Sequence, residues 1–211
     1  MDLEHIRKDY LAGAINGEIF PEEPFDWFVS WLKDAVDSGE PEPTALVLST
    51  VSSEGNPSSR VVLLKSFDKN GFVFFTNYQS RKGIQLSFNN AAAMVFFWPL
   101  TERQVRIEGF VNKVDLAESD QYFASRPPES RINAIISPQS NPIASRKQLE
   151  EQHLKLLSDS IEKANIRPEN WGGYRLIPHL IEFWQGRPGR LHDRIQFELS
   201  GGKWLVTRLA P

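Results

Sequence analysis

The strongest constraint on the fold is a set of short segments rich in β-branched and aromatic residues, separated by turn-forming sequences. In chain order they are TALVLSTVS, SRVVLLKSF, GFVFFTN, AAAMVFFWPL, RQVRIEGFVNKV, YRLIP, HLIEFWQG, DRIQFELS and KWLVTRL. Runs of this composition favour β-strands, and Gly201-Gly202 between the last two favours a tight hairpin. Because strands joined by short turns pair antiparallel, we expect an antiparallel sheet.

Helices are expected beside this sheet. A short one is predicted over Leu3 to Ala14, and another from Ser80 to Asn89. A clearer helix lies between them, ending just before Gly39. Its apolar stripe is formed by residues at helical spacing, namely Phe25, Phe28, Val29, Leu32 and Val36. Such a stripe needs a partner surface, so this helix should pack against the sheet.

The β signal disappears between Leu116 and Ala164. Prolines break this stretch into short helices, of which the last is expected from Arg146 to Ala164. The breaking residues are Pro127, Pro128, Pro138 and Pro142. The sequence therefore predicts a mainly β protein with peripheral helices (an α+β chain), built around a closed or nearly closed antiparallel barrel. We expect one domain over residues 1–211, with an N-terminal helical segment at 1–40 and a helical insertion at about 116–164.

Composition excludes several kinds of chemistry. With 27 acidic and 24 basic residues the net charge is -3, so no global positive field is available to hold a nucleic acid or an anionic membrane. Cysteine is absent, which removes disulfides, thiolate nucleophiles and Cys-ligated metals. No metal site is expected, since the four histidines have no paired spacing. The charged N-terminus lacks the apolar run of a signal peptide and no window matches a membrane span, so a cytoplasmic location is expected.

Local clusters of cations form candidate anion sites despite the acidic balance. In RVVLLK, Arg60 and Lys65 flank an apolar strand. They should face opposite sides of a regular strand, so the strand must bend or end there if both serve neighbouring ligands. In SRKGIQ, Ser80 can cap a helix whose first turn holds Arg81 and Lys82, a placement that opposes the helix dipole unless an anion binds. Solubilising surface charge remains the alternative for both segments.

A third cluster lies in QYFASRPPES. Tyr122 and Arg126 are four residues apart on one helical face, and the Pro-Pro pair ends that helix before another begins near Ser130. A phosphate could accept hydrogen bonds from the hydroxyls of Tyr122 and Ser130, while the Arg126 guanidinium donates to two of its oxygens. Packing of Tyr and Arg in a helix corner is the alternative reading of the same pattern.

The fourth cluster, EFWQGRPGRLHDR, holds three arginines and a histidine within eight positions. Such a group is costly as a mutually repelling surface patch, and an anion or an electron-rich ring would resolve the conflict. His192 beside Asp193 does not indicate a hydrolase, because there is no serine elbow and adjacent strand residues face opposite ways.

Together these segments resemble the pyridox(am)ine 5'-phosphate oxidase family over nearly the whole chain. The likeness is carried, in order and spacing, by RVVLLK, TNYQSRKGIQ, WPLTERQVRIEG, YFASRPPESR, SPQSNPI and EFWQGRPGRLHDR. The resemblance implies a split-barrel, FMN-binding fold and a homodimer with flavin at the subunit interface. It also implies oxidation of pyridoxamine and pyridoxine 5'-phosphates to pyridoxal 5'-phosphate, with oxygen as the electron acceptor. The family name implies an oxidoreductase acting on CH-NH2 donors.

The resemblance also assigns residues to ligands. FMN would be held by Arg60, Val61, Val62, Leu63, Leu64, Lys65, Phe75, Thr76, Arg81, Lys82, Gln104, Gln139, Ser140, Trp184 and Arg194. Substrate would be bound by Lys65, Tyr122, Arg126, Ser130, Arg190, Leu191 and His192, with Arg7, Lys8, Asp9 and Tyr10 in a segment that can close over it. Arg190 and His192 would lie over the pyridine ring as catalytic residues. Phe75 departs from the pattern, since many relatives have tyrosine there.

Two other functions stay open at this point. The chain could be a split-barrel carrier or sensor of flavin or pyridoxal phosphate without oxidase activity, although a carrier would not need the substrate cluster. It could also be a reductase of another substrate on the same fold. No glycine-rich dinucleotide motif follows a strand, which argues against a nicotinamide-dependent enzyme.

Overall fold

The computed structural model describes residues 2–5, 8–159 and 165–211. Within these ranges nine strands form one antiparallel sheet: β1 Ala45–Val51, β2 Pro57–Leu63, β3 Ser66–Asp68, β4 Gly71–Asn77, β5 Ala91–Trp98, β6 Arg103–Lys113, β7 Trp171–Gln185, β8 Asp193–Ser200 and β9 Lys203–Leu209. The α-helices of the same ranges surround it: α1 Pro24–Asp37, α2 Arg81–Phe88, α3 Leu116–Ser125, α4 Pro128–Ile136 and α5 Arg146–Asp159. The antiparallel sheet with peripheral helices confirms the expected fold class.

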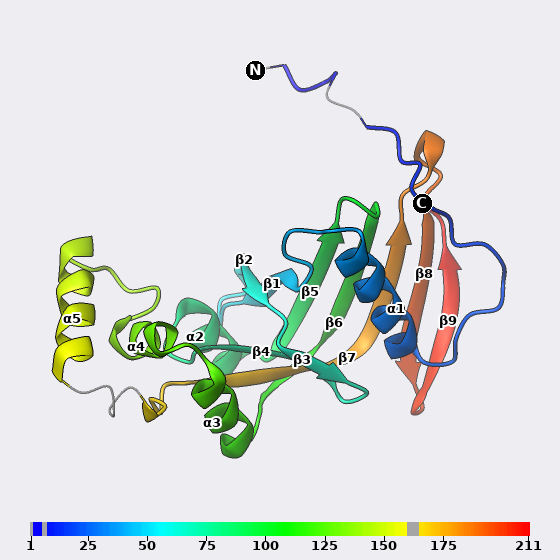
Figure 1. The fold of residues 1–211 in the computed structure, drawn as a ribbon. Helices are drawn as coiled ribbons and strands as arrows, with labels where there is room; N and C mark the ends of the chain where they lie inside the picture. Colours follow the sequence, from blue (N-terminus) through cyan, green and yellow to red (C-terminus); the bar gives the residue numbers. More distant parts are fainter. Residues whose placement is uncertain (1, 6–7, 160–164) are drawn as a thin grey trace.

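The sheet curls into a split barrel (Figure 1). Its strand order is β2-β1-β5-β6-β7-β4-β3, and only two residues, Leu64 and Lys65, separate β2 from β3 at the opposite edges. Their backbone N–H groups donate to Thr44 and Val73, 2.9 Å each, which ties the two edges together. The barrel is therefore almost closed, and Lys65 lies at its seam.

Strand β7 joins the two parts of the molecule. Its first half pairs with β4 and its second half with β8, while β6 runs along its other side. Two separate strands were expected here, before and after Pro178, and that expectation is wrong. A bulge explains the continuity, because Gly109 lies opposite Pro178 and Glu108 opposite Leu180, which leaves His179 unpaired in the ladder.

The expected β8–β9 hairpin is confirmed. Gly201 and Gly202 have φ of 57° and 79°, the left-handed values that a two-residue hairpin turn needs at both central positions. The expected helix over Leu3 to Ala14 is wrong for residues 2–5 and 8–14, which are not helical. The backbone N–H groups of Leu11 and Ala12 bond to the distant carboxylate of Glu102 instead, so a tertiary contact replaces helical hydrogen bonds there.

Helix α1 fills the space between the barrel and the β8–β9 hairpin (Figure 1). Phe28 is fully buried among Phe67, Phe72 and Phe96, with ring centroids 4.8–5.1 Å apart. The expected stripe is corrected in part, because Val29 and Val36 are exposed. Trp31 and Ala35 are buried in their place.

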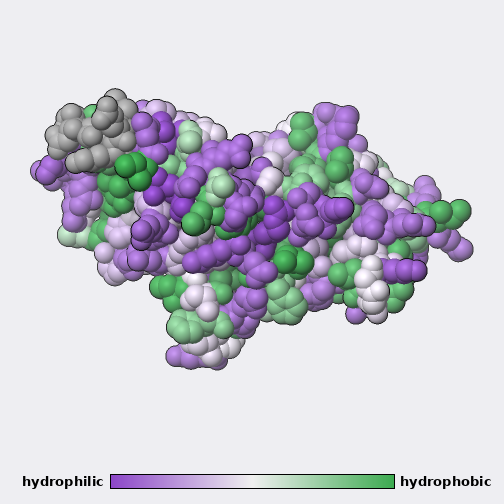
Figure 2. All heavy atoms as spheres, turned by 90° about the horizontal axis from the view of Figure 1, so that it is seen from below, coloured by the Kyte–Doolittle hydropathy of each residue, from purple (hydrophilic) through white to green (hydrophobic). Residues whose placement is uncertain are grey.

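The other described helices lie where the sequence placed them, within 80–89 and along the insertion. The end of the last expected helix, at positions 160–164, falls outside the described residues. No described helix is long and apolar enough to cross a membrane. On the face seen from below, hydrophilic residues predominate and hydrophobic ones are scattered in small groups (Figure 2). The single-domain organisation and the cytoplasmic location stay predictions.

Candidate functional site

A pocket of about 980 Å³ opens where β2, β4 and α2 of the barrel face α3 and α4. That volume lies at the upper end of ordinary ligand pockets, which leaves room for more than one small ligand. Fourteen of the residues that the sequence assigned to ligands line it: Arg60, Val61, Val62, Leu63, Lys65, Phe75, Thr76, Arg81, Lys82, Tyr122, Arg126, Ser130, Gln139 and Ser140.

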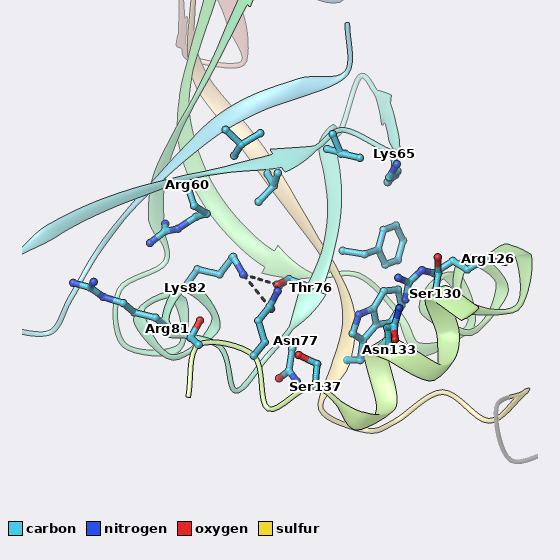
Figure 3. A pocket seen from close by; sticks show the side chains of 18 of the residues that line it. Arg60, Lys65, Thr76, Asn77, Arg81, Lys82, Arg126, Ser130, Asn133 and Ser137 are labelled. Carbon is cyan, nitrogen blue, oxygen red and sulfur yellow. Dashed lines mark hydrogen bonds between the residues drawn. The ribbon is translucent and has the colours of Figure 1, made fainter. Parts of the chain in front are cut away.

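The cations of the pocket form two groups. Arg60, Arg81 and Lys82 lie on one side, and Lys65 and Arg126 lie on the other with Ser130 (Figure 3). No Asp or Glu is among the described residues that line the pocket, so these five cations have no carboxylate partner there. Unpaired cations repel one another in a partly buried site, and two separated anionic groups would neutralise them.

Lys82 carries the clearest sign of an anion site. Only 7% exposed, its ammonium bonds to the Thr76 hydroxyl at 2.8 Å and to the Gln139 side-chain oxygen at 3.2 Å. Burial lowers the pKa of Lys82 to about 8, and the charge of Arg60 adds to the effect. A buried ammonium held by neutral oxygens is an unfavourable arrangement that a bound phosphate would relieve.

Helix α2 presents that ammonium from its first turn. Ser80 caps the helix by accepting from the Gly83 N–H, as the sequence indicated. Gly83 is required there, because a Cβ would lie against the Tyr78 carbonyl oxygen. The helix N-terminus and two cations therefore all face the pocket from one short element.

Arg60 and Lys65 reach the same pocket because the strand between them ends. Strand β2 stops at Leu63, and Lys65 follows in the connection to β3. Arg60 is held by the Thr50 hydroxyl at 2.6 Å, and its pKa is lowered by burial and then by the charge of Arg81. Leu64 differs from its neighbours, since its side chain is buried in the core and it does not line the pocket.

The helix corner between α3 and α4 supplies the other side of the pocket. The guanidinium of Arg126 lies over the Trp171 ring at 4.7 Å, and its Nη1 atom is buried without a hydrogen-bond partner among the described residues. Burial lowers the pKa of Arg126, an effect that Tyr122 opposes. The ring of Tyr122 stacks on Phe75 at 3.9 Å. An orphaned, charged donor of this kind fits a phosphate oxygen.

Several lining residues were missed by the sequence analysis. Asn133 follows Ser130 by three residues and Ser137 follows Asn133 by four, so all three share one face of α4 and its end. That polar spacing was a signal that could have found them. Asn77 and Trp171 lie at paired ends of β4 and β7, and no local pattern marks that pairing.

Most of the other residues assigned to FMN or substrate lie outside the pocket, near the end of β7. Gln104, Trp184 and Arg194 lie side by side on β6, β7 and β8, because Trp184 pairs with both of the others. Cross-strand partners share a face of the sheet, so these three form one row. Arg194 is bonded twice to the buried carboxylate of Glu182, at 3.0 Å each, and this bond raises its pKa.

His192 completes this second cluster. Its ring lies 4.7 Å from that of Trp184, and its Nδ1 accepts a hydrogen bond from the Arg187 N–H. The other ring nitrogen, Nε2, therefore carries the proton and can donate to a ligand. Arg190 and Leu191 are exposed in the turn after β7, where Arg190 has a left-handed φ of 62°.

Part of the N-terminal segment lies against the same cluster. Tyr10 packs edge-on to Trp184 and His192, with centroids 5.5 and 5.6 Å apart. Lys8 pairs with Glu102 at 2.9 Å, and Asp9 is exposed. Arg7 lies outside the described residues.

The two groups of residues are far apart on one chain. Trp171 in the pocket and Trp184 in the second cluster are thirteen residues apart on β7, which at about 3.3 Å per residue is up to roughly 40 Å along the strand. Figure 1 shows the two ends of β7 at different ends of the molecule. One small ligand cannot touch both groups of the same chain.

Family models match both regions of the chain. One, described as "Pyridoxamine 5'-phosphate oxidase", matches residues 32–155. Another, described as "Pyridoxine 5'-phosphate oxidase C-terminal dimerisation region", matches residues 171–211. The pocket lies mainly in the first match, and the second cluster mainly in the other.

Relatives match over essentially the full length. Proteins named pyridoxine/pyridoxamine 5'-phosphate oxidase from Polynucleobacter asymbioticus and a Synechocystis species are 51% and 48% identical, covering 99% and 100% of this chain and 99% of each relative. Among solved structures, PhzG from Burkholderia lata, in complex with tetrahydrophenazine-1-carboxylic acid, has a TM-score of 0.86 at 32% identity, covering 94% of this chain and 100% of that one. An FMN-binding protein from Nostoc punctiforme shares the fold, with a TM-score of 0.74 at 17% identity and coverage of 91% and 100%.

Proposed function

We propose, since the chain belongs to the pyridoxamine 5'-phosphate oxidase family, that it oxidises pyridoxamine and pyridoxine 5'-phosphates to pyridoxal 5'-phosphate. It is an oxidoreductase of this family, and its cofactor is FMN. In the proposed reaction oxygen accepts the electrons and becomes hydrogen peroxide. With the amine substrate, water also supplies the aldehyde oxygen and ammonia is released. The reaction would serve the biosynthesis and salvage of vitamin B6. The observation that carries the proposal is the pocket with two separate groups of cations and no carboxylate among its described lining residues.

The first group fits the phosphate of FMN. Arg60, Arg81 and Lys82 offer three positive charges, and the capped N-terminus of α2 adds its dipole. The neutral partners Thr76 and Gln139 hold the Lys82 ammonium in place without neutralising it. FMN supplies the electron-accepting chemistry, which no side chain of a cysteine-free protein offers.

The second group fits the phosphate of the substrate. Lys65 and Arg126 supply charge, while the hydroxyls of Tyr122 and Ser130 supply neutral hydrogen bonds. The orphaned Nη1 of Arg126 is the donor that such a phosphate would satisfy. The stacked rings of Phe75 and Tyr122 fix the position of the tyrosine hydroxyl. The hydroxyl that Phe75 lacks is not needed for this stacking.

Arg190 and His192 are the proposed catalytic residues. Arg190 stays protonated, so it orients the pyridine ring and stabilises negative charge rather than accepting a proton. His192 donates from Nε2, because its Nδ1 is occupied by the Arg187 N–H. Trp184 beside it limits where the ring can lie and excludes water from that side.

The separation of the two groups supports a homodimer. If pocket and second cluster serve one reaction, each site must combine the pocket of one subunit with the β7 end of its partner. FMN would then lie at the interface, in contact with the row of Gln104, Trp184 and Arg194 on the second subunit. The match of residues 171–211 to a dimerisation region supports this arrangement.

Two alternatives make different predictions. A flavin carrier without oxidase activity would not use the second cation group, so its FMN would stay oxidised when substrate is added. An enzyme acting on a tricyclic acid, the kind of ligand in the PhzG complex, would not need hydroxyls arranged for a second phosphate. The presence of Lys65, Tyr122, Arg126 and Ser130 in the pocket favours a phosphorylated substrate.

The test starts with the visible spectrum of the purified protein, followed by addition of pyridoxamine 5'-phosphate in air. We expect a yellow protein that produces an aldehyde and hydrogen peroxide together. Flavin that stays oxidised with substrate under anaerobic conditions would support the carrier instead. A colourless protein that cannot be reconstituted with FMN would contradict the cofactor assignment.

A further inference from the structure

Glu102 has an unusual backbone and an unusual environment. It is one of three non-glycine residues with positive φ in the described chain, at 56°. Its side chain is only 5% exposed, although it lies in the turn between β5 and β6. Burying a carboxylate costs free energy, and so does a left-handed backbone at a non-glycine residue. Such features persist where surrounding contacts stabilise them.

The contacts that hold Glu102 come from the N-terminal segment. One carboxylate oxygen accepts from the backbone N–H groups of Leu11 at 2.6 Å and Ala12 at 2.8 Å, and the other pairs with Lys8 at 2.9 Å. Burial raises the pKa of Glu102, but the bonds from Ala12, Lys8 and Leu11 outweigh this and keep it below its ordinary value. The Glu102 carboxylate thus binds backbone N–H groups that lie about ninety residues earlier in the chain.

The same glutamate is fixed to the end of β7. Its carbonyl oxygen accepts from the Gly186 N–H at 2.8 Å and from the side chain of Gln185 at 3.3 Å. Residues 185 and 186 come directly after Trp184, so Glu102 connects the N-terminal segment to the second cluster.

The contacts of Glu102 hold the Tyr10 side chain at the end of β7. Its ring lies directly on Gly186, where a Cβ would approach the Tyr10 Cγ to 2.7 Å. Trp184 and His192 contact the same ring edge-on. Figure 1 shows the N-terminal segment passing beside the turn that follows β7. Glycine at 186 therefore leaves the space that Tyr10 occupies.

We propose that Glu102 is a positioning residue that anchors residues 8–12 and thereby fixes Tyr10 as one wall of the site at His192. The anchor holds residues 8–12 where the Tyr10 ring contacts Trp184 and His192. Without the anchor, the segment would have to be ordered when substrate binds, and that loss of conformational entropy would lower substrate affinity. This inference rests on the proposed function only for its effect on catalysis, because the anchoring itself is independent of any ligand.

The anchor is tested with Glu102→Gly, measured by hydrogen–deuterium exchange of the Leu11 and Ala12 amides in the FMN-loaded protein. Glycine tolerates the left-handed φ, so this variant removes the carboxylate without adding backbone strain. We expect exchange of these two amides to become about tenfold faster or more, with core amides of β7 unchanged. Glu102→Gln keeps one acceptor oxygen and should restore part of the protection. Exposed Glu18, changed to glycine, is the matched control.

Catalysis gives the second readout. Glu102→Gly and Gly186→Ala should both raise KM for pyridoxamine 5'-phosphate about tenfold, with a smaller change in kcat and unchanged FMN affinity. Only Glu102→Gly should speed the exchange of the Leu11 and Ala12 amides, because Gly186→Ala displaces the Tyr10 ring and leaves the Glu102 carboxylate in place.

Unchanged exchange in Glu102→Gly would overturn the anchor. Faster exchange with unchanged KM would overturn the role of Tyr10. A wild-type protein without turnover would overturn the proposed function, and the exchange result would still decide the anchor.

Discussion

At the scale of single residues, the pocket is defined by charges that lack their usual partners. Within the described part of the chain, Lys82 has only neutral hydrogen-bond partners, Arg126 has an orphaned Nη1, and half-buried Arg60 lies near the charge of Arg81. Each arrangement costs free energy in the ligand-free chain. Residues of this kind were recognisable in the sequence as cations in unexpected places, such as the first turn of a helix. Which of them lack partners was not recognisable, because that depends on side chains from distant segments.

Lys82 leads to a pH prediction. Its pKa is about 8 in the folded, ligand-free chain and 10.5 ordinarily, so the unfolded chain binds more protons between these values. Stability of the ligand-free protein should therefore gain a contribution as pH rises from 8 to 10.5. FMN affinity should change the opposite way, because deprotonation removes the charge that meets the phosphate. We expect the Kd of FMN to rise by up to about tenfold per pH unit above about pH 8.

The measurement is a fluorescence titration of the FMN-free protein at several pH values. Lys82→Met should weaken binding at about pH 7 and flatten the slope above about pH 8. Exposed Lys69, changed to Met, is the control and should keep the wild-type slope. A slope that is the same in Lys82→Met and in the wild type would show that another group titrates.

At the scale of elements, helix α1 and strand β7 show where sequence patterns reach their limit. The spacing of apolar residues located α1 correctly, yet it included Val29 and Val36, which are exposed. Periodicity gives the existence of an apolar face but not its centre, because the partner surface decides which side chains are covered. In β7, Pro178 looked like a strand end, and the bulge at His179 accommodates it. The bulge exists only in relation to β6, so it has no local signal.

Helix α1 provides a stability prediction with an internal control. Phe28→Ala removes a fully buried ring that packs on Phe67, Phe72 and Phe96, and should lower the free energy of unfolding by about 3–5 kcal/mol. Val29→Ala, one position along the same helix but exposed, should change it by less than about 0.5 kcal/mol. The free energies of unfolding of both variants are compared by denaturant unfolding at a fixed FMN concentration. Equal effects would contradict the orientation of α1.

At the scale of the whole molecule, the distance along β7 determines how a site can be built. The pocket and the second cluster belong to opposite halves of this strand, since β4 pairs with its first half and β8 with its second. The family resemblance predicted that one set of residues binds FMN and substrate. The fold places some of these residues in the pocket and the others in the second cluster. Both parts can act together only if a second copy of the chain brings its β7 end to the pocket.

Mixing two inactive variants tests this arrangement. Arg126→Ala disables the pocket and His192→Ala disables the second cluster, so each alone should have little activity. Random exchange of subunits gives half mixed dimers, in which one of two sites combines an intact pocket with an intact cluster. About a quarter of wild-type activity should therefore return on mixing. Sites contained within single chains would give no recovery. Mixing Arg126→Ala with Lys65→Ala, both in the pocket, is the control and should recover nothing.

Local rules were enough to locate some features of this protein from its residues alone. β-Branched and aromatic composition located the strands, Ser80 marked the start of α2, and Gly201-Gly202 marked the last hairpin. Each of these features depends only on residues that are close together in the sequence. Packing between distant segments was needed for the rest: it brings Asn77 and Trp171 to the pocket, binds Glu102 to the segment at Leu11, and separates the candidate ligand residues into two groups. Those outcomes depend on contacts between residues tens of positions apart, and such contacts are set by how whole elements pack rather than by the spacing of residues within any one of them.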